Sequence, residues 1–95
     1  MAGYIALVHK DLGTSYGVSF PDVPGCIAAG DTFEEAITNA SDALTSHFAV
    51  MKADGDAIPA PRSFEQLRCD PDFAEDSADA IVTMVTPRTA MAAAE

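Results

Sequence analysis

The sequence has few cysteines, few basic residues and no long hydrophobic run, and each shortage disfavours a class of protein. Its two cysteines, Cys26 and Cys69, lie far apart and form no CxxC pair. We therefore favour two free thiols over a disulfide, and we expect no zinc site. No apolar run approaches the roughly 18 residues that a membrane-spanning helix needs. The first residues show neither a basic region nor a small-residue cleavage site, so we expect no signal peptide, no membrane and a cytoplasmic protein.

Basic residues are scarce and unevenly placed. Fifteen acidic residues and five basic ones give a formal net charge of -10, and no lysine or arginine occurs between Asp11 and Met51. Binding to a nucleic-acid backbone needs clustered Lys and Arg, so we expect none by this chain. An acidic domain can instead attract a basic partner, or occupy a basic surface that would otherwise hold nucleic acid. Taken alone, the charge also fits a simpler role in solubility.

The first part of the chain reads as strands. Ninety-five residues, 48% of them hydrophobic, suffice for one domain and not for two. Residues 4–10 (YIALVHK) are apolar on both alternating faces, which predicts a central strand covered on both sides. Residues 15–20 alternate cleanly, so they predict a strand with one buried face, paired with the first in a hairpin. PDVPG at 21–25 ends this strand, and we expect a short third strand at 26–29.

A long helix is predicted to follow. Thr32 and Glu35 have the spacing of a capping box at its start. Gly55 suits a C-terminal cap, and Pro59 and Pro61 prevent continuation. The apolar residues between these signals recur at steps of three and four and form one stripe that predicts packing on the sheet: Phe33, Ala36, Ile37, Ala40, Leu44, Phe48 and Met51.

The remaining residues predict one more helix and one more strand. Ser63 can cap a short helix that ends near Pro71, and the acidic stretch 70–79 is expected to be solvated and mobile. Residues 81–86 (IVTMVT) predict the last strand, beside the first. We therefore expect an α+β fold of β-β-β-α-α-β order, with a small mixed sheet and the long helix on one sheet face. Self-association, as a dimer or tetramer, is the simplest way to cover the other face.

Four acidic residues are the candidate site residues: Asp22, Asp31, Glu34 and Glu35. They raise the hypothesis of a divalent-metal nuclease, because two-metal catalysis needs converging carboxylates. However, capping and the helix dipole already explain the last three, and the first strand supplies no carboxylate. No histidine stands in a motif that would activate Cys26 as a nucleophile. We expect no catalytic residue, metal or cofactor, and interpret the four acids as contacts to a protein partner.

Two segments together resemble a known family. Residues 15–44 (SYGVSFPDVPGCIAAGDTFEEAITNASDAL) and 57–63 (AIPAPRS) are similar to the signature of HicB-like antitoxins, and with the first and last strands the resemblance covers nearly the whole chain. It implies a partial ribonuclease-H-like fold and membership in a type II toxin–antitoxin pair. In that family the partner is HicA, a small basic protein that cleaves RNA, and the antitoxin binds it and covers its active site.

The resemblance has one departure. Many members of the family continue into a DNA-binding domain, whereas nothing in the last residues, VTPRTAMAAAE, predicts a groove-entering helix or ribbon. We expect a single HicB-like domain over residues 1–95, with a poorly ordered tail at 87–95 and no DNA-binding domain. The chain is then either a short member of the family or part of a longer one. The alternatives to the antitoxin reading are an orphan module that binds another protein or a small ligand, and the metal nuclease.

Overall fold

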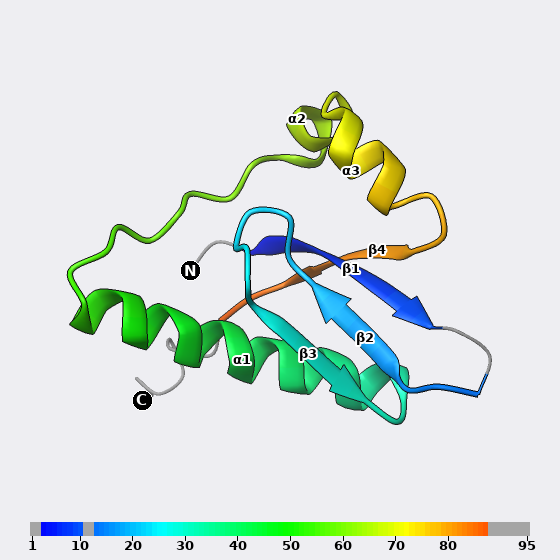
Figure 1. Ribbon diagram of the computed structural model, residues 1–95, viewed down its shortest axis with the longest axis horizontal. Helices are drawn as coiled ribbons and strands as arrows, with labels where there is room; N and C mark the ends of the chain where they lie inside the picture. Colours follow the sequence, from blue (N-terminus) through cyan, green and yellow to red (C-terminus); the bar gives the residue numbers. More distant parts are fainter. Residues whose placement is uncertain (1–2, 11–12, 88–95) are drawn as a thin grey trace.

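A four-stranded antiparallel sheet forms the centre of the fold, in the strand order β3-β2-β1-β4 (Figure 1). The structure, a computed structural model, describes residues 3–10 and 13–87. The strands are β1 (Tyr4–Lys10), β2 (Tyr16–Ser19), β3 (Ile27–Gly30) and β4 (Ile81–Val85). The central place of the first strand and its hairpin with the second are confirmed, because β1 pairs with β2 on one side and with β4 on the other.

One face of the sheet packs on the long helix α1 (Phe33–Ala53). Tyr4, Ala6 and Val8 point to this face, where the Tyr4 ring lies 5.3 Å from the ring of Phe48. The predicted apolar stripe of the helix therefore forms one side of the main core, as expected. The buried residues of this core are Tyr4, Ala6, Val8, Val18, Phe20, Val23, Cys26, Ala36, Ala40, Leu44, Phe48 and Val85.

The beginning of α1 is capped as predicted, with one difference. The Thr32 hydroxyl accepts a hydrogen bond from the Glu35 amide at 3.0 Å. The Glu35 carboxylate reaches back to the Asp31 amide at 2.7 Å, one residue before the cap. Gly30 lies so close to this turn that a Cβ atom added there would overlap the backbone of Ala36. The end of β3 and the start of α1 are thus locked together.

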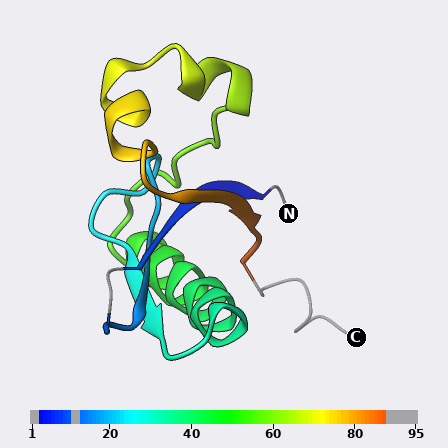
Figure 2. The ribbon, with the colours of Figure 1, turned by 90° about the vertical axis from the view of Figure 1, so that its right-hand side faces the viewer.

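Two short helices cover part of the opposite sheet face. They are α2 (Phe64–Arg68) and α3 (Pro71–Asp76), and Figure 2 shows them beyond the edges of the strands, on the side away from α1. Leu67 of α2 and Phe73 of α3 are buried against Ile5 and Leu7 of β1. The two-sided apolar pattern of β1 is therefore satisfied within one chain, and self-association is not needed to cover it.

The acidic stretch 70–79 corrects a prediction, because it contains a helix that we did not expect. Asp70 caps α3 by accepting from the Asp72 amide at 2.9 Å, and Pro71 occupies the first turn. The buried Phe73 anchors this helix to the sheet. The element order is therefore β-β-β-α-α-α-β, while the surrounding carboxylates stay exposed to solvent.

The predicted α+β fold is confirmed, but the sheet is not mixed. Every neighbouring pair of strands is antiparallel. The reason is the route after α1: residues 54–63 and the two short helices carry the chain back to the end of β1, so β4 enters there and runs against it (Figure 1). Within the described ranges, no helix combines the length and apolar character needed to cross a bilayer.

Candidate partner-binding surface

Asp22 is bonded within the chain and stands apart from the other three predicted acids. It lies in the loop between β2 and β3, and its side chain is only 8% exposed. Both carboxylate oxygens accept hydrogen bonds of 2.7 Å from Arg62, one from the backbone amide and one from Nε. Arg62 also donates to Asp70 at 3.1 Å. Asp22 therefore fastens the segment before α2 to the loop before β3.

The Arg62 cluster has a clear electrostatic effect. Hydrogen bonds from the Arg62 guanidinium, with help from the Asp72 amide, lower the pKa of the Asp70 carboxyl. The same bonds, to Asp22 and Asp70, raise the pKa of Arg62. Arg62 could not be identified from the sequence. Asp22 lies 40 positions away, and Asp70 lies 8 positions away in no recognisable motif. The three side chains form a structural clamp between the loop, the linker and α3.

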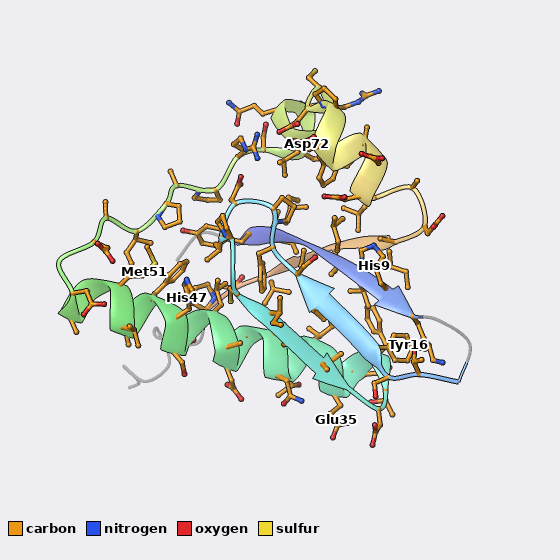
Figure 3. All side chains as sticks on the ribbon, viewed as in Figure 1. His9, Tyr16, Glu35, His47, Met51 and Asp72 are labelled. Carbon is orange, nitrogen blue, oxygen red and sulfur yellow. The ribbon has the colours of Figure 1, made fainter. Side chains whose placement is uncertain are left out.

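The other three predicted acids do come together. Asp31, Glu34 and Glu35 are exposed at the first turn of α1, next to the end of β3. Figure 3 shows Glu35 there, with His47 two-thirds of the way along the same helix. Carboxylates are stabilised at the positive end of a helix dipole. This acidic end of α1 is open to a basic partner.

An exposed isoleucine marks the other end of β3. Ile27 is 71% exposed, although it is a large β-branched side chain. Three shallow hollows of about 260 to 370 Å³ meet around it. They are formed by α1 with Val50 and His47, by the β2 side with His9, and by loop 21–25 with Asp76 of α3. We call Ile27 and Val50, with the acidic end of α1, the β3–α1 surface.

Ile27 was not found from the sequence. The third strand, IAAG, is short and weakly patterned, so its exposed face could not be identified. A single exposed apolar residue is ordinary, but Ile27 and the exposed Val50 of α1 line the same hollow, and adjoining exposed apolar groups mark interaction sites. The β3–α1 surface combines such a group with acidic residues at one end.

Few groups on this surface could carry out chemistry. Burial raises the pKa of the Cys26 thiol, which makes it a poor nucleophile. Nε2 of His9 lies 3.0 Å from the Asp76 carbonyl, on the far side of the sheet from α1. Among residues 3–10 and 13–87, no three His, Cys, Asp or Glu side chains are grouped so that they could hold a metal ion. The geometry suits binding by contact.

Comparison with known proteins decides the family. Residues 4–93 match the family model described as the HicB-like antitoxin of bacterial toxin–antitoxin systems. The chain belongs to this HicB-like antitoxin family. The resemblance drawn from the two sequence segments is thereby confirmed, and so is the predicted family fold, since the chain superposes on a crystal structure of the Burkholderia pseudomallei antitoxin HicB with a TM-score of 0.76 and 31% identity.

Two further relatives of this HicB-like chain are informative. An uncharacterised 14.9 kDa protein of Haemophilus phage HP1 is 43% identical over 76 residues, which are 80% of this chain and 54% of the phage protein. A HicA3–HicB3 toxin–antitoxin complex contains a chain with a TM-score of 0.71 and 26% identity, covering 90% of this chain and 98% of that one.

The HicB-like chain spans only part of some relatives. It matches about half the length of the phage protein. The match to the Burkholderia antitoxin includes 90% of this chain and 63% of that one.

Proposed function

We propose that this chain is an antitoxin that binds a small basic toxin of the HicA type, covers it, and has no catalytic activity of its own. The observation that carries the proposal is its likeness, over nearly the full length of both, to a chain from a complex of HicA3 with HicB3. Membership in an antitoxin family supports the same function. The net charge of -10 suits a basic partner, because opposite charges speed encounter and favour the correct pairing.

The toxin is proposed to dock on the β3–α1 surface. Ile27 and Val50 offer exposed apolar area at one end of this surface, while Asp31, Glu34 and Glu35 offer charge at the other. Protein–protein interfaces combine apolar and polar contacts in this way. Asp22 is not part of this proposal, since its carboxylate is occupied by Arg62.

Three further features belong to the proposal. The chain self-associates, acts in the cytoplasm, and does not itself contact nucleic acid. The last point is supported by the lack of a basic cluster: the chain has five Lys and Arg residues in all, and Arg62 and Arg68 are already paired with carboxylates.

Co-expression with a HicA-type toxin tests the proposal. We expect affinity capture of the toxin on the tagged chain and relief of the growth arrest that the toxin causes alone. Ile27→Lys should weaken capture at least about tenfold, because it places a charge among the apolar contacts. Glu34→Lys should slow association, most strongly at low salt, because a charge at the rim acts mainly on encounter.

A matched control is available on α3. Asp72→Lys makes the same charge change at an exposed first-turn position of a helix on the other sheet face and should leave capture nearly unchanged. Equal losses for Glu34→Lys and Asp72→Lys would show that only net charge matters and would refute the docking surface. Absence of both capture and rescue would refute the antitoxin function and favour an orphan binding module. Magnesium-dependent RNA cleavage by the pure chain would favour the nuclease alternative.

A further inference from the structure

The two edges of the sheet are protected to different degrees. At β3, the Asn39 side chain on α1 donates to the Ala29 carbonyl at 2.8 Å, and Gly30 packs directly on the helix backbone. The edge of β3 is thus partly covered by α1. At β4, no element within residues 3–10 and 13–87 pairs with the outer side of the strand. Figure 2 shows β4 at the margin of the sheet opposite to β3.

The composition of β4 makes its open edge unusual. Its five residues, IVTMV, include no charge, proline or glycine. Proteins normally blunt an open edge with such residues, because unpaired backbone groups beside apolar side chains attract other strands. Ile81, Val82 and Met84 are 50%, 38% and 60% exposed. Apolar side chains therefore stand open on both faces of a strand whose outer edge has no partner among the described residues.

We propose that β4 pairs with β4 of a second copy of this chain, antiparallel about a two-fold axis near Thr83. This arrangement places Ile81 opposite Val85 and Val82 opposite Met84, so that apolar side chains meet on both faces. It joins the two sheets into one continuous antiparallel sheet and covers the outer edge of both β4 strands. The contact is isologous and closes on itself, so it yields a dimer and not a fibre.

The lack of charged residues in β4 favours a second copy of the chain over a basic partner at this edge. A basic partner would be selected by carboxylates, and β4 has none. Pairing of β4 with itself brings no like charges opposite each other within the strands. The acidic end of α1 follows β3, at the other edge of the sheet, where the toxin is proposed to dock. The two edges therefore serve two different partners.

This inference rests on the proposed self-association and gives it a surface, and it is independent of toxin binding. Sedimentation velocity of the full chain over a concentration series tests it. We expect a monomer–dimer equilibrium whose dissociation constant rises at least about tenfold in Met84→Lys, because two lysines are then held at the interface. Met84 is exposed in the single chain, so an unchanged circular dichroism spectrum should accompany the loss.

Ile27→Lys is the matched control, since it adds the same charge at an exposed position of the other edge strand. It should leave the dimer intact while weakening toxin capture, and Met84→Lys should do the reverse. A chain that stays monomeric at all concentrations overturns the inference even if it captures toxin. A dimer that survives Met84→Lys, or that is lost in Ile27→Lys, overturns the assignment to β4.

A disulfide test examines the axis separately. In a Cys69→Ser background, which removes the exposed native thiol, Thr83→Cys should form a covalent dimer on mild oxidation, because the two cysteines face each other. Ala29→Cys in the same background, on β3, should not. Crosslinking at Ala29→Cys, or none at Thr83→Cys, would overturn pairing about Thr83.

Discussion

Asp22 and Glu34 are both carboxylates in the same acidic part of the sequence, yet they have different roles. The Asp22 side chain is largely buried and accepts two bonds from Arg62, so replacing it would leave the Arg62 guanidinium with Asp70 alone and remove the acceptor of its backbone amide. Glu34 is exposed at the first turn of α1, where it is free to meet a partner. The sequence alone could not separate these roles, because Arg62 lies 40 positions from Asp22.

Gly30 provides a prediction at the scale of one residue. Gly30→Ala should destabilise the fold by about 1–3 kcal/mol, the usual cost of overpacking, because the added methyl group would overlap the backbone of Ala36. Gly17→Ala is the control: it lies in the neighbouring strand with open space around it, and we expect a change within about 1 kcal/mol. Urea unfolding of the two variants measures the difference. Equal stability would show that α1 can shift away from β3.

Local signals in the sequence were sufficient for the cap of α1 and for the turns at Gly25 and Gly55. Thr32 caps α1, and Gly25 and Gly55 adopt the positive φ angles of 87° and 83° that favour glycine. These features depend on a few neighbouring residues, so a pattern can reveal them. The exposure of Ile27 depends on which strand becomes the edge of the sheet, and no local pattern contains that information.

Among the elements, α3 shows where composition misleads. Its segment is dominated by aspartate and glutamate, which argued for solvated chain, and Phe73 is its only large apolar residue. That one aromatic ring reaches the sheet and packs edge-on against Phe64 at 6.2 Å between ring centres. The cap at Asp70 and its bond to Arg62 then hold the helix in place. Contacts with distant residues therefore stabilise α3, a helix that the spacing of apolar residues in the sequence does not predict.

The clamp between α3 and the linker should make stability depend on pH. Because the pKa of Asp70 is lowered from its ordinary value of 3.8, its stabilising contribution is complete above that value and is lost as the pH falls through the lower folded pKa. Arg62→Met removes the main cause of the shift and should destabilise the chain at neutral pH. The difference in stability between wild type and variant should narrow below about pH 4.

Thermal unfolding across this range measures the effect, with Arg68→Met as the control. Arg68 pairs with Glu65 on the surface, where both side chains are exposed, so its loss should matter little at any pH. A difference between Arg62→Met and wild type that stays constant down to about pH 2.5 would show that Arg62 acts through packing and not through the Asp70 charge.

At the scale of the whole molecule, salt should act in opposite directions on the two proposed contacts. Two copies with a net charge of -10 repel each other, so added salt should strengthen the dimer. Capture of a basic toxin gains from the same charge, so added salt should weaken it. Measuring both dissociation constants between about 50 mM and 500 mM salt tests this, since the Debye length falls severalfold over that range. Constants that change in the same direction would contradict one of the two assignments.

The pairing of β1 with β4 also sets the order in which the chain can fold during synthesis. Ile5 pairs with Met84, so β1 leaves the ribosome long before the strand that fills its second edge. Contacts between such distant residues slow folding and leave a strand edge open in the meantime. A growing chain can form the β1–β2 hairpin and α1 early, but its sheet is complete only once β4 has left the ribosome. The second edge of β1 therefore stays open to other strands for as long as the linker and the two short helices are being made.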